Sequence, residues 1–245
     1  MNRYYISRFK GLVYGPKEYA LYLKQCFNGE LARMQTEYGA CTTVAQHWDF
    51  ALKHFAPCQK PSEILGFLEW AKVEEPVTIV EIGVARGGTN YLLRNCIPSV
   101  EHMIGIDYFP RNTRLHRKLH PDSVKLDFVG GQSAGATTLA EVKRLLGGKP
   151  IDLLFIDGDH SYEGAMADYN AYSPLVRKGG WIAFHDIVPQ ARKADGSYVN
   201  GFEIDVDRIW GELSPKTESK EFIDSPDQHS YGIGVLREAN NADQS

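Results

Sequence analysis

Two clusters of acidic and imidazole side chains directly follow apolar runs in this sequence. The segment FIDGDHSYEG contains Asp157, Asp159 and His160, and the segment GWIAFHD ends in His185 and Asp186. Carboxylates are the usual ligands of hard divalent cations, and an imidazole with a pKa of about 6.5 can accept a proton near neutral pH. The two clusters therefore predict a site for a divalent cation, for proton transfer, or for both.

A structural explanation competes for the first cluster. Asp159 or Ser161 could cap a helix that begins near Tyr162, and acidic groups are favoured at the positive end of a helix. For one such cluster alone we would prefer the cap. The second cluster favours a catalytic or ligand-binding role over a helix cap, because ligands of open parallel sheets bind beyond the carboxyl ends of the strands.

The elements around these clusters predict an α/β fold. After Val77, the short β-rich runs TIVEIG, HMIGID, KLDFVG, IDLLFID and GWIAFHD alternate with helical patterns. Such alternation predicts a doubly wound, Rossmann-like, mostly parallel sheet with helices on both faces, and KEFID and YGIGVL predict a C-terminal antiparallel hairpin. We expect a helical N-terminal extension over residues 1–76, one domain over residues 77–236 and a polar tail over residues 237–245. Gly179 and Gly180 are expected to form a turn before the fifth strand.

A glycine-rich loop follows the first strand and resembles two phosphate-binding motifs without matching either. Residues 83–89 have the spacing of a P-loop but lack its lysine, and the dinucleotide fingerprint would need a glycine where Ala85 stands. Glu81 lies two positions before the first glycine and favours a cation over a pyrophosphate. Asp107 ends the second strand, where it could bind ribose hydroxyls or serve as a simple turn residue.

Composition excludes several other classes of protein. The net charge of −4 gives no general attraction to nucleic acid. The four cysteines share no CxxC spacing, so reduced thiols fit better than a disulfide framework or a zinc site. There is no signal-peptide pattern, and no run approaches the roughly 18 apolar residues of a membrane span. We therefore expect a cytoplasmic protein without a membrane or nucleic-acid partner.

Four segments together are similar to a known family. EIGVARGGTN, GIDYFP, DLLFIDGDHSYEG and LVRKGGWIAFHDIVP resemble class I S-adenosylmethionine-dependent methyltransferases. More narrowly, they resemble small-molecule O-methyltransferases that include the macrocin and aminocoumarin sugar methyltransferases and the cephalosporin-hydroxylase-like proteins. The resemblance spans Val77 to Leu236. It implies methyl transfer to a hydroxyl of a sugar or natural product, a small-molecule acceptor, and assistance by Mg²⁺ or Mn²⁺.

The resemblance also implies roles for individual residues. The cofactor would lie along the first loop, Asp107 would take its ribose diol, and the GGQS stretch would flank its adenine. The implied cofactor-binding residues are Glu81, Gly83, Val84, Ala85, Gly87, Asp107, Gln132, Ser133 and Asp157. The implied metal ligands are Asp157, His185 and Asp186. His185 stands where the family often has a carboxylate, which shifts metal preference from magnesium toward manganese, iron or zinc, or makes His185 a base instead.

The catalytic base has three candidates, Asp159, His160 and His185. We favour His160 because its ordinary pKa suits proton transfer near neutrality. By the habit of the family, the N-terminal helices would cover the acceptor pocket and mediate homo-oligomerisation.

Two alternatives to a methyltransferase remain. A Rossmann-type NAD(P)-dependent oxidoreductase would need the glycine fingerprint, against which Ala85 and Glu81 argue. A non-catalytic cofactor-binding partner subunit would not need the two acid–imidazole clusters.

Overall fold

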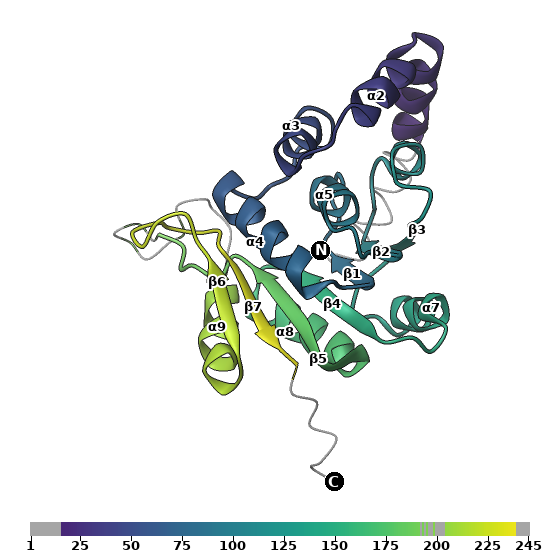
Figure 1. Cartoon of the computed structure of the whole chain (residues 1–245). Coiled ribbons are helices and arrows are strands. Elements are labelled where there is room, and N and C mark those ends of the chain that lie inside the picture. Colours follow the sequence, from purple (N-terminus) through teal and green to yellow (C-terminus); the bar gives the residue numbers. More distant parts are fainter. Residues whose placement is uncertain (1–15, 192, 194, 196–197, 199–203, 239–245) are drawn as a thin grey trace.

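Five parallel strands form most of the sheet. The computed structural model describes residues 16–191, 193, 195, 198 and 204–238. Strands β1 and β4 are buried almost throughout, as expected of a sheet covered on both faces. The strand order is β3-β2-β1-β4-β5-β7-β6 (Figure 1). The five strands are β1 (Thr78–Ile82), β2 (His102–Asp107), β3 (Lys125–Gly130), β4 (Ile151–Ile156) and β5 (Val176–His185).

The order of the strands creates a switch point between β1 and β4. The chain proceeds outward from β1 to β2 and β3, and then returns to place β4 on the other side of β1. Connections leave β1 and β4 in opposite directions, which opens a crevice at their carboxyl ends. The glycine loop and the first acid–imidazole cluster therefore start at adjacent positions of the sheet.

The C-terminal strands complete the sheet. Strand β6 (Ser219–Phe222) pairs antiparallel with β7 (Ile233–Arg237), which confirms the predicted hairpin. Strand β7 is also antiparallel to β5 and lies between β5 and β6. The sheet is thus mostly parallel with an antiparallel C-terminal pair, as the sequence predicts.

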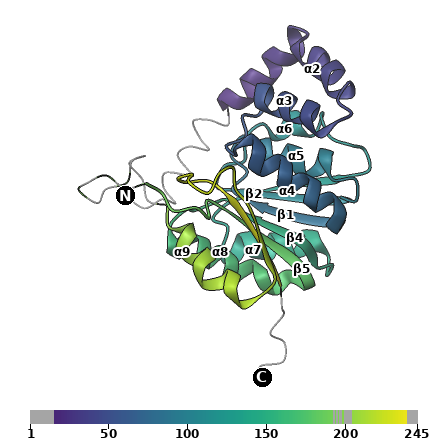
Figure 2. The ribbon, with the colours of Figure 1, turned by 60° about the vertical axis from the view of Figure 1, so that its left-hand side comes forward.

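Helices cover both faces of the sheet, as Figure 2 shows. One face carries α3 (Val44–His54), α4 (Pro61–Glu74) and α5 (Gly88–Cys96), and the other carries α7 (Ala136–Leu146), α8 (Tyr162–Tyr172) and α9 (Val206–Leu213). Each face has its own buried apolar cluster. The remaining helical elements are residues 16–27, α2 (Glu30–Gly39), α6 (Thr113–His116), η1 (Ser173–Leu175) and η2 (Ser214–Lys216).

The helices before Pro76 share a core with the sheet. Thr43 caps α3 through a capping box with Gln46, as the threonine pair in the sequence suggests. Phe67 of α4 packs edge-on against Phe155 of β4, with 5.6 Å between ring centroids. The apolar cluster on this face therefore continues across the expected boundary at residue 76. Residues 1–15 of the expected extension and 239–245 of the expected tail lie outside the described residues.

The prediction of a turn at Gly179 and Gly180 is wrong, because both residues belong to β5. The pairing of β4 with β5 shifts register here, from Ile151 opposite Val176 to Leu153 opposite Trp181. Gly179 has φ of +69°, so the glycine pair forms an irregularity inside the strand. Glycine is common in both turns and bulges because both can use positive φ, and the sequence does not distinguish the two.

All four cysteines are free thiols. Within the described part of the chain, no helix combines the length and the apolar character needed to cross a bilayer.

Candidate functional site

The loop after β1 and the end of β4 pack backbone against backbone. Gly83 has φ of +96°, and a Cβ atom there would overlap the carbonyl oxygen of Asp157. The Gly83 amide donates to Ile106 O at 2.8 Å, and the Asp157 amide donates to Ile82 O at 2.8 Å. A glycine is therefore required at position 83 by the protein itself, in addition to any ligand that approaches the loop.

The two acid–imidazole clusters come together beyond β4 and β5. His160 Nδ1 lies 2.8 Å from Asp186 Oδ2, and His185 Nδ1 lies 3.1 Å from Asp157 Oδ1 and 3.5 Å from Asp186 Oδ1. Asp186 adopts a left-handed backbone with φ of +65°, which is uncommon for a residue other than glycine. The chain thus holds two carboxylates and two imidazoles in one contiguous cluster at the switch point.

Charge pairing dominates the protonation of this cluster. Burial lowers the pKa of His160, but the hydrogen bond to Asp186 and the charges of Asp157 and Asp186 outweigh it, so the pKa lies above its ordinary value. Burial likewise lowers the pKa of His185, and Asp157 and Asp186 together raise it well above normal. Burial raises the pKa of Asp186, whereas hydrogen bonds from both imidazoles hold it far below its usual range. The carboxylates therefore require positive charge beside them, either protons on the imidazoles or a cation.

The candidate ligand set for a metal differs by one residue from the set implied by the sequence. One ligand atom from each of Asp157, His160 and Asp186 lies within 4.8 Å of the others. His185 is 3% exposed, and its Nε2 is buried without a partner among the described residues. The structure thus adds His160 to the carboxylates, while ligation by His185 stays a prediction.

Gln59 belongs to the site, and sequence reasoning missed it. It lies between α3 and α4, is 6% exposed, and donates from Nε2 to Asp157 Oδ2 at 2.9 Å. Its Oε1 accepts from Thr89 Oγ1 at 2.6 Å. Gln59 thereby orients Asp157 from the N-terminal part of the chain. No motif or periodicity in the sequence marks it.

Asp107 ties the glycine loop to the end of β2. Its Oδ2 accepts from the Ala85 amide at 2.7 Å, and its Oδ1 accepts from the Phe109 amide at 2.8 Å. Ala85, which replaces a glycine of the family, adopts φ of +48°. Each carboxylate oxygen can accept a further hydrogen bond, so Asp107 is still able to take hydroxyl groups.

Glu81 is buried behind the loop. Its Oε2 accepts from Asn90 Nδ2 at 2.8 Å, and the side chain is 1% exposed. Burial raises the pKa of Glu81 to about 8, the charge of Asp157 adds to this, and Asn90 and Arg94 oppose it. Glu81 is therefore mostly neutral at pH 7 and does not supply the charge for a cation that its position in the sequence suggests.

A series of buried, hydrogen-bonded polar side chains continues from Glu81, and it too was not predicted from the sequence. Arg94 Nη1 donates to Asn90 Oδ1 at 2.8 Å, and Arg94 Nη2 lies 2.9 Å from His116 Nδ1. His116 Nε2 lies 3.0 Å from the carbonyl oxygen of Arg86. Burial and the neighbouring Arg94 hold the pKa of His116 well below normal, so its neutral ring accepts from Arg94 and donates to Arg86. A Cβ at Gly87 would overlap this ring, so Gly87 serves packing of the loop.

Two adjoining cavities open at the switch point. The first, of about 490 Å³, which we call the β3-side cavity, is lined by residues of the segments 82–85, 106–108, 131–134, 157–161 and 164–168. The second, of about 330 Å³, which we call the β5-side cavity, is lined by residues 56–59, 83–86, 88–89, 157, 160, 185–186, 204 and 230–231. Gly83, Ala85, Asp157 and His160 line both cavities, so the carboxylate and the imidazole lie where the cavities meet.

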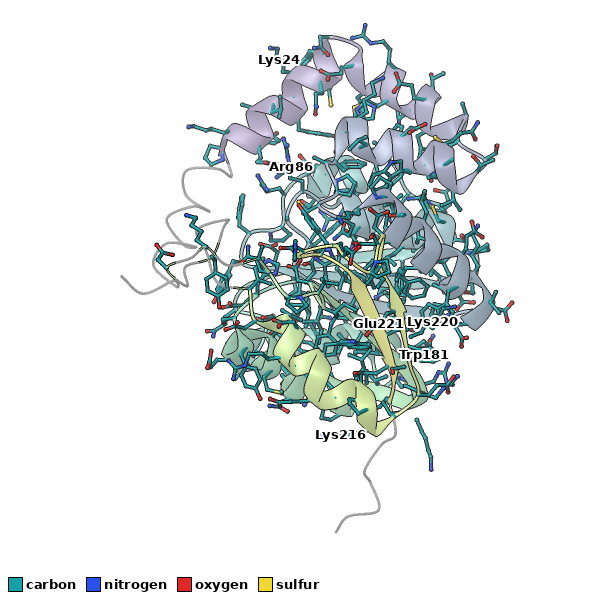
Figure 3. All side chains as sticks on the ribbon, turned by 90° about the vertical axis from the view of Figure 1, so that its left-hand side faces the viewer. Lys24, Arg86, Trp181, Lys216, Lys220 and Glu221 are labelled. Atoms are coloured by element: carbon teal, nitrogen blue, oxygen red, sulfur yellow. The ribbon has the colours of Figure 1, made fainter. Side chains whose placement is uncertain are left out.

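The predicted cofactor residues divide between these cavities. Gln132, Ser133, Asp107 and Asp157 line the β3-side cavity, and Val84 lines the β5-side cavity together with Gly83 and Ala85. Glu81 and Gly87 are in neither lining. Arg86 lines the β5-side cavity. In Figure 3 it is labelled in the upper part of the molecule, below the N-terminal helices, and Trp181 is labelled in the lower part.

Asp159 accepts hydrogen bonds at the N-terminus of α8 and also lines the β3-side cavity. Its Oδ1 accepts from the amide of Ser161 at 3.1 Å and from its hydroxyl at 2.8 Å. Ser161 in turn caps α8 by accepting from the Gly164 amide. The capping interpretation therefore holds for this part of the cluster, while His160 faces the junction of the cavities.

The far wall of the β5-side cavity is a constrained loop before β7. Ser230 and Tyr231 both have φ of +64°, and Gly232 follows with φ of +85°. Glu63 of α4 is fully buried, and its carboxylate accepts from the Gly232 amide at 3.0 Å and from Gln228 Nε2 at 2.7 Å. The Tyr231 ring lies edge-on to His185, at 5.9 Å between centroids. Glu63 thus holds the loop that brings Tyr231 beside the cluster.

The chain is similar to known proteins in sequence and in fold. Residues 80–187 match the family model described as a methyltransferase domain. An uncharacterized protein of Acanthamoeba polyphaga mimivirus is 32% identical over 125 residues, which cover 46% of this chain and 52% of that protein. The chain therefore matches about half the length of this curated relative.

Solved structures show the same fold at low sequence identity. The O-methyltransferase of Bacillus cereus in complex with SAH has a TM-score of 0.55 and 13% identity, over 79% of this chain and 89% of that chain. The O-methyltransferase TomG of Streptomyces achromogenes, involved in tomaymycin synthesis and solved with SAM, has a TM-score of 0.52 and 17% identity, over 79% and 88%. Residues 80–187 thus match a methyltransferase domain, and the chain has the Rossmann-like fold of these O-methyltransferase structures.

Proposed function

We propose that this protein transfers the methyl group of S-adenosylmethionine to a hydroxyl group of a small molecule. The observation that carries the proposal is the junction of two cavities at Asp157 and His160. A methyl transferase must bring a donor and an acceptor together in line at one point. The methyltransferase family model and the O-methyltransferases of the same fold support this chemistry.

The β3-side cavity would hold the cofactor. Asp107 would accept hydrogen bonds from the ribose hydroxyls, since its oxygens keep acceptor capacity beyond the two backbone amides. Gln132 and Ser133 would flank the adenine at the far end of the same cavity. Gly83 and Ala85 line both cavities, and this position would place the reactive methionine part of the cofactor at the junction.

The β5-side cavity would hold the acceptor. Its volume of about 330 Å³ is at the small end of the range of small-molecule sites, so it suits one sugar or aromatic ring. Pro57, Ile204 and Tyr231 supply apolar surface, and Gln59 and Arg86 supply polar groups. This mixture fits an amphiphilic ring with hydroxyl substituents, such as a sugar or natural product.

His160 would act as the base. In the transfer, the acceptor oxygen forms a bond to the methyl carbon, the carbon–sulfur bond breaks, and S-adenosylhomocysteine leaves as a neutral thioether. The hydroxyl proton must go to a nearby group. Asp186 holds Nδ1 of His160 at 2.8 Å, so that Nε2 remains to take the proton and the carboxylate stabilises the imidazolium that forms. His185 is more deeply buried than His160, which makes it the weaker candidate.

The cluster also fits a divalent cation. Asp157 and Asp186 offer oxygen atoms and His160 offers a nitrogen, all within 4.8 Å of one another, and this donor set is compatible with Mn²⁺ as well as Mg²⁺. With a cation bound there, His160 would be a ligand and not the base. Such a cation would lower the pKa of a bound hydroxyl.

Calorimetric titration tests the cofactor directly. The protein is titrated with S-adenosylhomocysteine and, separately, with NADH, each in the presence of Mg²⁺, Mn²⁺ or a chelator. We expect binding of S-adenosylhomocysteine and not of NADH. Binding of NADH alone would refute the proposal in favour of an oxidoreductase, and S-adenosylhomocysteine binding without turnover across a panel of hydroxyl acceptors would favour a non-catalytic subunit.

The His160→Ala variant tests the base. We expect turnover to fall by about 100-fold or more, because general-base catalysis contributes on that scale. S-adenosylhomocysteine affinity should stay within a few-fold of the unaltered protein. Retained turnover would move the base to Asp159 or His185.

A further inference from the structure

Arg86 places a positive charge without a protein partner in the wall of the β5-side cavity. Its side chain is exposed, and it lines this cavity but not the β3-side cavity. Within the part of the chain that the structure describes, its guanidinium group has no ion-pair or hydrogen-bond partner. Two carboxylates that line the same cavity, those of Asp157 and Asp186, are paired with imidazoles instead. The β5-side cavity therefore offers a free cation to whatever fills it.

The fold fixes the backbone from which this side chain leaves. The carbonyl oxygen of Arg86 accepts from Asn112 Nδ2 at 3.1 Å and from His116 Nε2 at 3.0 Å. Both neighbours of Arg86 have positive φ, 48° at Ala85 and 87° at Gly87. Such backbone conformations persist where the surrounding structure determines them. The buried His116, which methyl transfer does not use, thus helps to place Arg86 at the cavity.

The cofactor has a carboxylate of its own, in its methionine part, but α5 offers that group another partner. Backbone amides in the first turn of a helix lack intrahelical acceptors and attract anions. Gly88 and Thr89 form the start of α5 and line the β5-side cavity. The methionine part would lie at the junction of the cavities, within the same lining. The cofactor therefore does not require Arg86, and the guanidinium remains for the acceptor.

A carboxylate suits this guanidinium better than other anions do. Arginine presents parallel N–H donors that bind both oxygens of a carboxylate. A phosphate would bring up to two negative charges into a cavity that Asp157 and Asp186 also line, and would be repelled more strongly. Resting on the proposed function, we infer that the methyl acceptor is a hydroxy acid, with its carboxylate bound by Arg86 and its hydroxyl at the junction of the two cavities.

The consequence is a preference for acids over their neutral derivatives. An amide of the same acid fills the same space but offers the guanidinium no charge. Because Arg86 is exposed, water and salt screen the pair. We therefore expect a preference of about 3-fold or more, the scale of an exposed ion pair, and not the much larger factors of buried pairs.

Cys58 reports the charge of the cavity without a known acceptor. It is an exposed free thiol that lines the β5-side cavity, whereas Cys26 is an exposed thiol outside both cavities. Iodoacetate and iodoacetamide alkylate thiols and are similar in size, but only iodoacetate carries a carboxylate. The ratio of their rates at each cysteine is measured by peptide mass spectrometry. This ratio cancels any effect of a substitution on the reactivity of the thiol itself.

We expect the iodoacetate-to-iodoacetamide ratio at Cys58, taken relative to Cys26, to fall by about 3-fold or more in Arg86→Gln. Arg86→Lys keeps the charge and should retain the ratio. Arg33→Gln, which removes an exposed arginine of α2 and changes the net charge equally, is the control and should also retain it. An unchanged ratio in Arg86→Gln would overturn the inference.

Protection of Cys58 from iodoacetamide tests the class of acceptor. With S-adenosylhomocysteine present, 3,4-dihydroxybenzoate should protect the thiol at a concentration about 3-fold or more below that of 3,4-dihydroxybenzamide, and Arg86→Gln should remove the difference. Equal protection by the acid and the amide, or protection by neither, would overturn the inference. Stronger protection by phenyl phosphate than by the acid would overturn the assignment to a carboxylate.

Calorimetry separates this inference from the proposed function. S-adenosylhomocysteine affinity should stay within about 2-fold in Arg86→Gln, whereas a loss of about 10-fold or more would assign Arg86 to the carboxylate of the cofactor and overturn the inference. Failure of the unaltered protein to bind S-adenosylhomocysteine would instead overturn the proposed function. The labelling ratio at Cys58 would still show whether Arg86 attracts a carboxylate, because that measurement needs no cofactor.

Discussion

Replacing Glu81 by glutamine should change how the stability of the protein depends on pH. Burial raises the pKa of Glu81 from its ordinary 4.5 to about 8 in the folded chain. Between these values the folded state keeps a proton that the unfolded state has lost, so rising pH favours unfolding. The full pKa shift corresponds to about 5 kcal/mol of unfolding free energy. As the pH rises from below 4.5 to 7, about 3 kcal/mol of this stability is lost. Glu81→Gln cannot ionise, and its amide oxygen can still accept from Asn90.

The assay is urea unfolding of both proteins at pH 5, 6, 7 and 8. Other titrating groups contribute equally to both and cancel in the difference between the two free energies of unfolding. We expect the free energy of unfolding of Glu81→Gln, taken relative to that of the unaltered protein, to increase by about 3 kcal/mol or more between pH 5 and pH 8. Glu141→Gln is the control, since Glu141 lies at the surface and a hydrogen bond from Arg144 lowers its pKa, so it stays ionised throughout this range. Parallel pH profiles for unaltered and Glu81→Gln proteins would refute a neutral Glu81.

Three other substitutions test the geometry of the site. Gly83→Ala should cost about 3 kcal/mol or more of unfolding free energy, whereas Gly148→Ala, which has a positive φ but open space, should cost about 1 kcal/mol; equal losses would contradict the overlap with Asp157. Gln59→Leu should reduce turnover more than S-adenosylhomocysteine affinity, because Gln59 lines only the β5-side cavity; a calorimetric loss as large as the kinetic one would argue otherwise. Asp107→Ala should weaken S-adenosylhomocysteine binding about 10-fold or more, and unchanged affinity would remove Asp107 from the ribose role.

The sequence was sufficient for the elements and for the location of the two clusters. The parallel strands contain short apolar runs; Asp107 ends β2, and Asp157 and Asp186 directly follow β4 and β5. Because parallel strands end at one edge of a sheet, their proximity could be inferred without coordinates. The ligand set could be inferred only in part, since the choice between His160 and His185 depends on side-chain direction.

The residues that were missed share a physical reason. Gln59 reaches Asp157 from a segment without periodicity, and a long-range hydrogen bond of this kind leaves no pattern in the sequence. The neutral state of Glu81 likewise follows from burial, which spacing does not reveal.

The two cavities differ in which parts of the sequence supply their lining residues. Every residue that lines the β3-side cavity falls between positions 82 and 168, whereas the β5-side cavity draws on residues as far apart as positions 56 and 231. Short exchanges at residues 56–59 or 230–231 would reshape the acceptor side and leave the lining of the cofactor side intact. Under the proposed function, descendants of this chain could diverge toward new acceptors through changes at its periphery, while one uninterrupted central stretch preserves the methyl donor.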